Sequence, residues 1–312
     1  MSPPSAAGGP HQRHNPKSDA SRNRTIGRST LSRHARFAEI SPEVGVLDEV
    51  ALDRVLAEDP DATLAMVADL VHATDERLRA RAKRIAARLV IDRSRAGRAV
   101  RPGVSRPRQV PATRGGDLDV DASLDGIVTA RGERRTPGLD ELAARDWGQQ
   151  GMALCLLVDA SGSMRGERLA IAATVAAACA MRAPSQHAVL AFAGDVRTLR
   201  TLHGSEPAAT VVNRVLALRG HGVTHLADAL RAASRQLAVA RAQRQVVVLL
   251  SDCRHTDEDP VAAARTLPEL LVLAPRDDAD QAEAFAKAAG ARVASLGSLA
   301  DAPALLNRLL AR

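Results

Sequence analysis

From residue 151 onward, short apolar runs alternate with longer segments of helical periodicity. The apolar runs are 153–158, 187–193, 246–250, 270–274 and a weaker one at 291–296, and the helical segments are 165–182, 207–218, 226–242, 280–289 and 299–310. Strands that alternate with helices of this length predict a mostly parallel sheet with helices on both faces. The segment 196–202 follows the preceding run so closely that we expect an antiparallel edge strand. We therefore predict a doubly wound α/β fold with a six-stranded sheet.

The chain before residue 151 has a different pattern. Residues 37–93 show apolar spacings of three and four, which predict helices, and Asp59 before Pro60 is a favourable helix start. The segment 116–128 alternates apolar and acidic residues, which predicts a half-buried connecting strand. We accordingly expect a disordered basic tail (1–36), a smaller helical region (37–93), a basic linker with the connecting strand (94–150) and the α/β domain (151–312).

Composition narrows the class of protein. Hydrophobic residues make up 46% of the 312 residues, which is ample for a core, but none of the apolar runs reaches the roughly 18–20 residues that a membrane span needs. The three cysteines, Cys155, Cys179 and Cys253, are odd in number and widely spaced. Such cysteines are typical of reduced proteins, and the N-terminus has no apolar signal segment, so we expect a cytoplasmic protein without a membrane span.

The net charge of +7 is unevenly distributed. Residues 77–114 carry 13 Lys and Arg against one acidic residue, whereas residues 37–76 carry 11 Asp and Glu against one basic residue. The basic block is either a nucleic-acid-binding segment, whose phosphate contacts would be salt-dependent, or a solvated helix face and linker that pair with the acidic block. The scarcity of aromatic residues argues against stacking on single-stranded bases.

The stretch "LLVDASGSMRG" (156–166) ends a predicted strand in Asp159, Ser161 and Ser163. A simple helix cap is one reading of these side chains. A nucleophile elbow needs a glycine two positions before the serine, and neither serine has one. The chain also contains no Walker A sequence, so we expect no ATP hydrolysis by this protein.

A metal site accounts better for these residue types. Mg²⁺ takes six oxygen ligands and retains water readily, and one carboxylate with two hydroxyls supplies part of that shell. Further oxygens are available at other strand ends: Thr224 lies in a Gly-rich turn before a predicted helix, and Asp252 follows an apolar strand. Ligands in doubly wound sheets bind beyond the carboxyl ends of the strands, where these loops meet.

Three motifs in order make the resemblance to a family specific. They are D-A-S-G-S at 159–163, G-V-T at 222–224 and S-D at 251–252. Together they resemble the metal-ion-dependent adhesion site (MIDAS) of von Willebrand factor type A (VWA) domains, over roughly residues 150–312. One departure is Cys253, which stands where glycine is common in the family.

The resemblance implies a ligand set and a role. Ser161, Ser163 and Thr224 would contact Mg²⁺ directly, and Asp159 and Asp252 would hold it partly through water, with Mn²⁺ as the alternative ion. Such sites leave one coordination position open, and a partner protein's Asp or Glu fills it. The family therefore implies a non-catalytic, metal-dependent binding module.

The nearest group within the family is suggested by the N-terminal half. A helical region, then "DLDVDASL" and the basic "RGERR" (131–135), resembles bacterial VWA proteins that work beside MoxR-type AAA+ ATPases, and also the D subunit of magnesium chelatase. The chain lacks the AAA+ module of that subunit, which favours a stand-alone adaptor. A component of a chelatase-like metal-insertion complex and a nucleic-acid-binding protein are the alternatives.

Four residues at the rim of the expected site form a separate candidate: His221, His225, Cys253 and His255. Imidazole and thiolate ligands favour softer ions such as Zn²⁺ or Ni²⁺, so a second metal site is one interpretation. The other is a free cysteine beside surface histidines.

Overall fold

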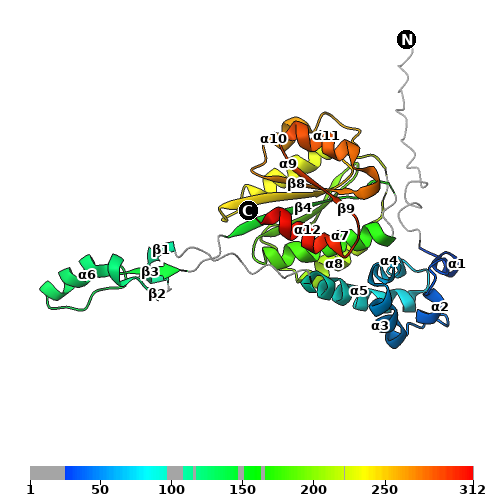
Figure 1. Ribbon diagram of the computed structural model, residues 1–312, viewed down its shortest axis with the longest axis horizontal. Helices are drawn as coiled ribbons and strands as arrows, with labels where there is room; N and C mark the ends of the chain where they lie inside the picture. Colours follow the sequence, from blue (N-terminus) through cyan, green and yellow to red (C-terminus); the bar gives the residue numbers. More distant parts are fainter. Residues whose placement is uncertain are drawn as a thin grey trace, which may run out of the picture.

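A computed structural model describes residues 25–96, 108–114, 117–146, 151–162, 166–220 and 222–311 (Figure 1). Its main sheet has six strands in the order β6-β5-β4-β7-β8-β9. These strands are β4 (Met152–Asp159), β5 (His187–Phe192), β6 (Val196–Arg200), β7 (Arg244–Leu250), β8 (Leu270–Pro275) and β9 (Arg292–Leu296). β6 pairs antiparallel with β5 at one edge, and the other five strands are parallel. The predicted α/β fold and the antiparallel edge strand are confirmed.

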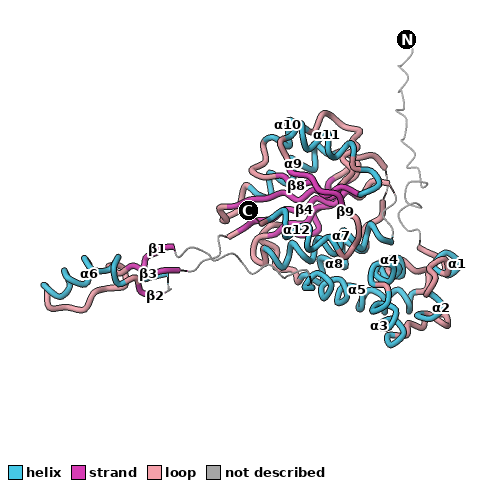
Figure 2. The backbone as a smooth tube through the Cα atoms, viewed as in Figure 1, coloured by secondary structure: helices cyan, strands magenta, loops and turns pink. Residues whose placement is uncertain are grey.

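Helices cover both faces of the sheet, as Figure 2 shows. One face carries α7 (Gly166–Arg182), α8 (Ala208–Leu216) and α12 (Asp301–Leu310), and the other carries α9 (Leu226–Leu237), α10 (Val261–Arg265) and α11 (Asp280–Ala289). A short 3₁₀ turn, η3 (Arg276–Asp278), follows β8. Along β4, Leu154 and Leu156 pack toward the α7 side, whereas Cys155 and Leu157 pack toward the α9 side. Because both faces are buried, the central strands are continuously apolar.

Five helices lie within residues 25–96. They are α1 (Arg28–Leu31), α2 (Phe37–Ile40), α3 (Glu49–Glu58), α4 (Pro60–Leu70) and α5 (Glu76–Ala96). The side chain of Asp59 accepts a hydrogen bond from the amide of Ala62 at 3.1 Å, with Pro60 as the first helical residue, which confirms the predicted start of α4. The helices predicted within 37–93 are therefore present, and α5 extends to Ala96, into the predicted linker.

The prediction of a disordered tail over residues 1–36 is wrong for its last part. Residues 1–24 lie outside the described residues, but α1 is ordered, and Leu31 is buried. The amide of Ile26 donates a 2.7 Å hydrogen bond to the carbonyl of His72. Apolar side chains within a mostly polar stretch thus anchor this part of the chain to the helices that follow.

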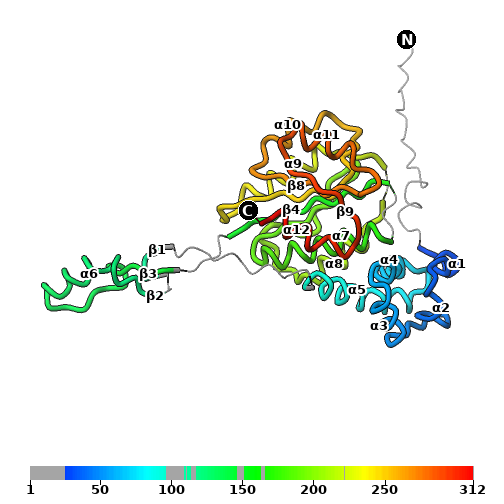
Figure 3. Tube along the Cα trace, viewed as in Figure 1, coloured from blue at the N-terminus to red at the C-terminus, as the bar shows by residue number. Residues whose placement is uncertain are grey.

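The N-terminal helices and the sheet region share one hydrophobic core. Figure 3 shows α4 and α5 lying beside α7 and α8. Leu70 and Leu78 belong to the same buried cluster as Leu169 and Ala173 of α7. The hydroxyl of Ser94 in α5 donates a 3.1 Å hydrogen bond to the carbonyl of Thr174. The domain boundary at residue 151 stays a prediction, but the two regions are packed together by apolar contact.

The segment between these regions contains a small sheet and a helix. β1 (Arg108–Pro111) and β2 (Asp117–Leu118) pair antiparallel with β3 (Ala143–Asp146), a 3₁₀ turn, η2 (Ala112–Arg114), follows β1, and α6 (Val120–Gly132) follows β2. The predicted strand over 116–128 is therefore wrong. Asp119 starts α6 by accepting a 3.3 Å hydrogen bond from the amide of Ala122, and Arg145 holds the same carboxylate at 2.8 Å. This local cap outweighs the alternating pattern.

No helix among the described residues is long and apolar enough to cross a membrane.

Candidate metal centre

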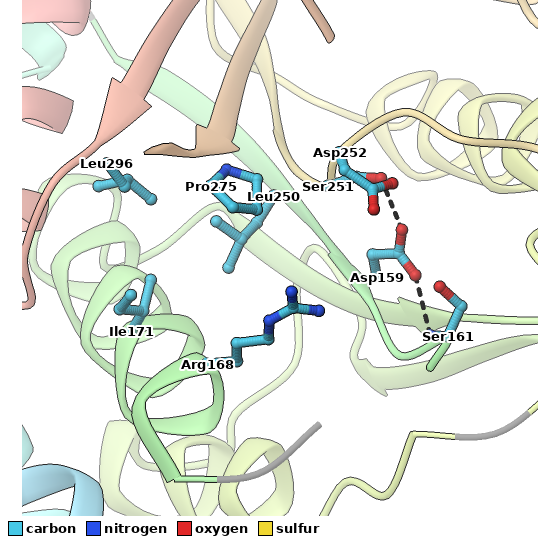
Figure 4. A pocket seen from close by; sticks show the side chains of 9 residues that line it. All are labelled: Asp159, Ser161, Arg168, Ile171, Leu250, Ser251, Asp252, Pro275 and Leu296. Atoms are coloured by element: carbon cyan, nitrogen blue, oxygen red, sulfur yellow. Dashed lines mark hydrogen bonds between the residues drawn. The ribbon is translucent and has the colours of Figure 1, made fainter. Parts of the chain in front are cut away.

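The candidate site lies at the carboxyl end of the central strands. Asp159 is the last residue of β4, and Ser251 and Asp252 directly follow β7, the strand paired with β4 on one side. Asp159, Ser161, Ser251 and Asp252 line one cavity at this sheet edge (Figure 4). Two of the three predicted segments therefore meet where the topology of a parallel sheet brings its loops together.

The carboxylate of Asp159 is held by two hydrogen bonds. Its Oδ1 accepts from the amide of Ser161 at 2.8 Å, and its Oδ2 accepts from the hydroxyl of Ser251 at 2.6 Å. Burial raises the pKa of the Asp159 carboxyl, the hydrogen bonds oppose that change, and the charge of Asp252 adds to it. Among the described residues, no Lys, Arg or His forms an ion pair with Asp159 or Asp252. A cation bound here would relieve the cost of this desolvated charge.

Ser251 was not among the predicted ligands, although it stands in the S-D motif. It is buried, and its hydroxyl accepts a 2.9 Å hydrogen bond from the amide of Cys253 while donating to Asp159. Cys253 has a φ of 61°. This left-handed conformation favours glycine, and the Cys253 amide donates to the Ser251 hydroxyl. Ser251 therefore orients the Asp159 carboxylate.

Thr224 lies in the turn before α9 and is buried. Its amide donates to the Thr256 hydroxyl at 3.2 Å, and its carbonyl accepts from the Thr256 amide at 2.9 Å. The next residue, His225, donates its amide to the carbonyl of Ala193 at 2.8 Å. The turn is thus fastened to the loops after β7 and β5, the two strands that flank β4. Within the described residues, no hydrogen bond joins the Thr224 side chain to Asp159, Ser161 or Asp252.

Of the five predicted ligands, the structure brings Asp159, Ser161 and Asp252 to one cavity and places Thr224 in an adjoining loop. Ser163 lies outside the described residues. The donors that do converge are carboxylate and hydroxyl oxygens, which suit Mg²⁺ or Mn²⁺ rather than softer ions. The described residues fit a hard divalent cation.

Among the described residues, the rim shows no grouped set of soft ligands. Burial raises the pKa of the Cys253 thiol to about 12, so it is protonated at neutral pH. The His255 ring lies 3.3 Å from the Cys253 carbonyl, and His221 is outside the described residues. In the part of the chain that the structure describes, no three His, Cys, Asp or Glu side chains are grouped to hold a metal. A cation at the candidate site would therefore need oxygen ligands besides Asp159 and Asp252, and the hydroxyls of Ser161 and Ser251 line the same cavity.

Two further residues act near the site and carry no local sequence signal. Arg168 of α7 lines the same cavity. Asp69 of α4 accepts a 2.8 Å hydrogen bond from the amide of Gly166, the first residue of α7, and its other oxygen lies 3.0 Å from Nε2 of His34. Gly166 has a φ of 47°, and a Cβ there would lie 3.4 Å from the Asp69 carboxylate. The N-terminal helices thus fasten the chain just after the D-A-S-G-S loop.

Part of the sheet domain matches a known protein family. Residues 154–255 match the family described as von Willebrand factor type A domain. No curated protein sequence is significantly similar to this chain. Similar solved structures include a von Willebrand factor type A protein from Catenulispora acidiphila, with 18% identity over 54% of this chain and 42% of that one, at a TM-score of 0.41.

Two other solved structures have the same level of similarity. The manganese-loaded TRAP protein of Plasmodium vivax is 18% identical over 52% of this chain and 74% of its own, with a TM-score of 0.44. An aerotolerance-related membrane protein of Bacteroides fragilis is 17% identical over 51% of this chain and 98% of its own, also at 0.44. Residues 154–255, which run from β4 to the loop after β7 within the six-stranded sheet domain, are therefore similar to von Willebrand factor type A domains.

Proposed function

We propose that this chain is a divalent-cation-dependent protein-interaction adaptor rather than an enzyme. Asp159, Ser161, Ser163, Thr224 and Asp252 would hold Mg²⁺, with Mn²⁺ as the alternative. The observation that carries the proposal is the desolvated Asp159 carboxylate, which shares a cavity with Asp252 and two hydroxyls and has no described cationic partner. The bound cation would supply a coordination position for the Asp or Glu carboxylate of a partner protein.

The chain's own residues prepare the site for this role. Ser251 orients Asp159, and the hydrogen bonds of the Thr224 turn hold it against the loops after β5 and β7. Within the described residues, neither Ser161 nor Ser251 has a histidine within hydrogen-bond reach, so the base of a hydrolytic serine is missing from their surroundings. This arrangement supports binding rather than nucleophilic catalysis.

We further propose a MoxR-type AAA+ ATPase as a partner and the cytoplasm as the location. The partner rests on the resemblance of the N-terminal half and the "RGERR" segment to proteins of that group. Cys155, Cys179 and Cys253 are buried free thiols, which fits a reducing compartment. A chelatase-like insertion complex stays the alternative assembly, and pull-downs with a purified MoxR-type ATPase and with chelatase subunits would separate the two.

Thermal unfolding with and without Mg²⁺ tests the proposal directly. The wild-type protein should be stabilised by Mg²⁺, and partner capture should be lost in EDTA. Asp159→Ala should abolish both effects while the protein remains folded. Asp53→Asn, which changes an exposed acid of α3, is the matched control and should behave as wild type. Partner capture that persists in EDTA would contradict the proposal.

A second candidate function is suggested by the exposed face of α5. Arg77, Arg81, Arg84, Arg88 and Arg95 follow one another at intervals of three, four or seven residues on its exposed side. Among the described residues, Arg77, Arg81 and Arg84 form no ion pair, and the Arg93–Asp61 contact at 3.8 Å joins the basic block to the acidic block. Arg88 and Arg95 pair with Asp92, and a regular arginine row with its first three members unpaired is suited to a phosphate backbone.

This nucleic-acid candidate has its own test. The affinity for duplex DNA, measured at two salt concentrations, should fall steeply as salt is added. The logarithm of the association constant should decrease with the logarithm of the salt concentration, with a slope of roughly 0.9 per phosphate contact. Substituting Arg77, Arg81 and Arg84 by Gln should reduce that slope, whereas Arg197→Gln in β6 should leave it unchanged. Failure to bind duplex DNA at low salt would remove this candidate and leave the adaptor proposal intact.

A further inference from the structure

The cavity that contains Asp159 continues into an apolar recess. The apolar lining comes from one residue of α7 and from the last residues of three neighbouring strands: Ile171, Leu250, Pro275 and Leu296. Figure 4 shows these side chains gathered at one end of the cavity, with the oxygen-bearing side chains at the other. The cavity volume is about 80 Å³, so the recess takes up a single small side chain beside the oxygen-lined end.

Arg168 lies between the two ends. It is one helical turn before Ile171, and its guanidinium points into the cavity toward Asp159 (Figure 4). Although Asp159 and Asp252 line the same cavity, Arg168 forms no ion pair with any described residue. A guanidinium presents several donors in a plane and pairs well with a carboxylate. Its position is therefore suited to an acidic group that the chain itself does not supply.

We propose that this cavity recognises a carboxylate that stands next to an aliphatic side chain. The inference rests on the proposed function and specifies its partner. The carboxylate occupies the oxygen-lined end, Arg168 donates hydrogen bonds to it, and the aliphatic side chain packs against Ile171 and Leu250. The recess has no described polar side chain besides Arg168, so a polar neighbour would lose its hydrogen bonds to water without replacement.

Two sources have this chemistry: an internal Glu or Asp followed by Leu, and the free carboxyl end of a chain that terminates in Leu. The experiment uses the full-length protein and short fluorescein-labelled peptides, with fluorescence anisotropy in Mg²⁺. The amidated peptides contain Glu–Leu, Glu–Ala or Gln–Leu at their centre. A fourth peptide lacks acidic side chains and ends in Leu with a free carboxylate, and its amidated form is the control.

The Glu–Leu peptide should bind at least about ten-fold more tightly than the Glu–Ala peptide, because the larger side chain buries several more carbon atoms. Ile171→Phe fills the recess and should remove this preference while leaving Glu–Ala binding unchanged. Arg168→Gln should weaken the binding of both Glu peptides, and Arg197→Gln, which changes an exposed side chain of β6, should weaken neither. Tight binding of the free Leu carboxylate alone would identify the chain terminus as the source and support the same chemistry.

Measurable and equal affinity for Glu–Leu and Glu–Ala would overturn the inference, as would measurable and equal affinity for Gln–Leu and Glu–Leu, or no binding of any peptide. The thermal stabilisation by Mg²⁺, measured on the same samples, separates this failure from that of the proposed function. If Mg²⁺ stabilises the wild type but not Asp159→Ala, the metal site stands and only the partner chemistry is wrong. If Mg²⁺ stabilises neither protein, the proposed function itself fails.

Discussion

Two buried histidines should make the stability of this protein fall steeply with acid. His72, just after α4, and His187, the first residue of β5, are 5% and 3% exposed. Burial, and then the positive charge of Arg219 beside His72 or Arg200 beside His187, lowers the pKa of each from 6.5 to about 4. The folded state therefore keeps both rings neutral at a pH where the unfolded chain protonates them.

The sign and size of the effect follow from proton linkage. Above about pH 6.5 both rings are neutral in either state, and their contribution to stability is fully present. As the pH falls toward about 4, the unfolded chain binds more protons than the folded state does. Each histidine thereby lowers the free energy of unfolding by about 3 kcal/mol. Arg135 lowers the pKa of the Glu141 carboxyl to about 2, so this carboxyl affects the free energy of unfolding only at lower pH.

Urea denaturation between about pH 7 and about pH 5 measures this dependence. Where both sites titrate, the free energy of unfolding should change by up to about 2.7 kcal/mol per pH unit, which corresponds to two protons. His72→Gln and His187→Gln should each halve the slope, whatever they do to the stability at neutral pH. A slope near zero in the wild type, or an unchanged slope in the double variant, would refute the reasoning.

Three further outcomes test the site and the packing. Asp159→Asn should lose the stabilisation by Mg²⁺, which is about 2.7 kcal/mol in the wild type at 100 times the dissociation constant. In EDTA the variant should be no less stable than wild type, because the amide oxygen still accepts from Ser161, the amide nitrogen can donate to the Ser251 hydroxyl, and no charge is buried. Asp69→Ala should weaken Mg²⁺ binding measured by calorimetry, because the Gly166 amide loses its acceptor, whereas Asp69→Asn should retain wild-type affinity. Equal affinity in both variants would show that the contact between Asp69 and Gly166 does not affect the metal site. Leu78→Ala should lower the free energy of unfolding by about 2–5 kcal/mol and keep a single unfolding transition, because α5 shares its core with α7. Two separate transitions in calorimetry would show that the two regions unfold independently.

The site was partly predictable because its signals are local. D-A-S-G-S and S-D each follow an apolar strand, and parallel pairing of β4 with β7 brings their ends together, so the neighbourhood of Asp159, Ser161 and Asp252 follows from strand order. The contributions of Asp69 and Arg168 could not be predicted in this way. Asp69 meets Gly166 across a tertiary contact between positions 97 residues apart, and no short motif encodes that approach.

Local pattern alone determined much of this protein. The alternation of apolar runs with helical segments specifies the α/β class, because strands buried on both faces have no polar positions, and Asp59 with Pro60 specifies the start of α4. The structure decided what depends on competing or distant contacts. The alternating segment after residue 116 became α6 because Asp119 caps it and Arg145, 26 residues away, holds that cap. Residues 25–36 became ordered because Leu31 is buried and Ile26 bonds to His72, and neither contact can be read from a polar stretch of sequence.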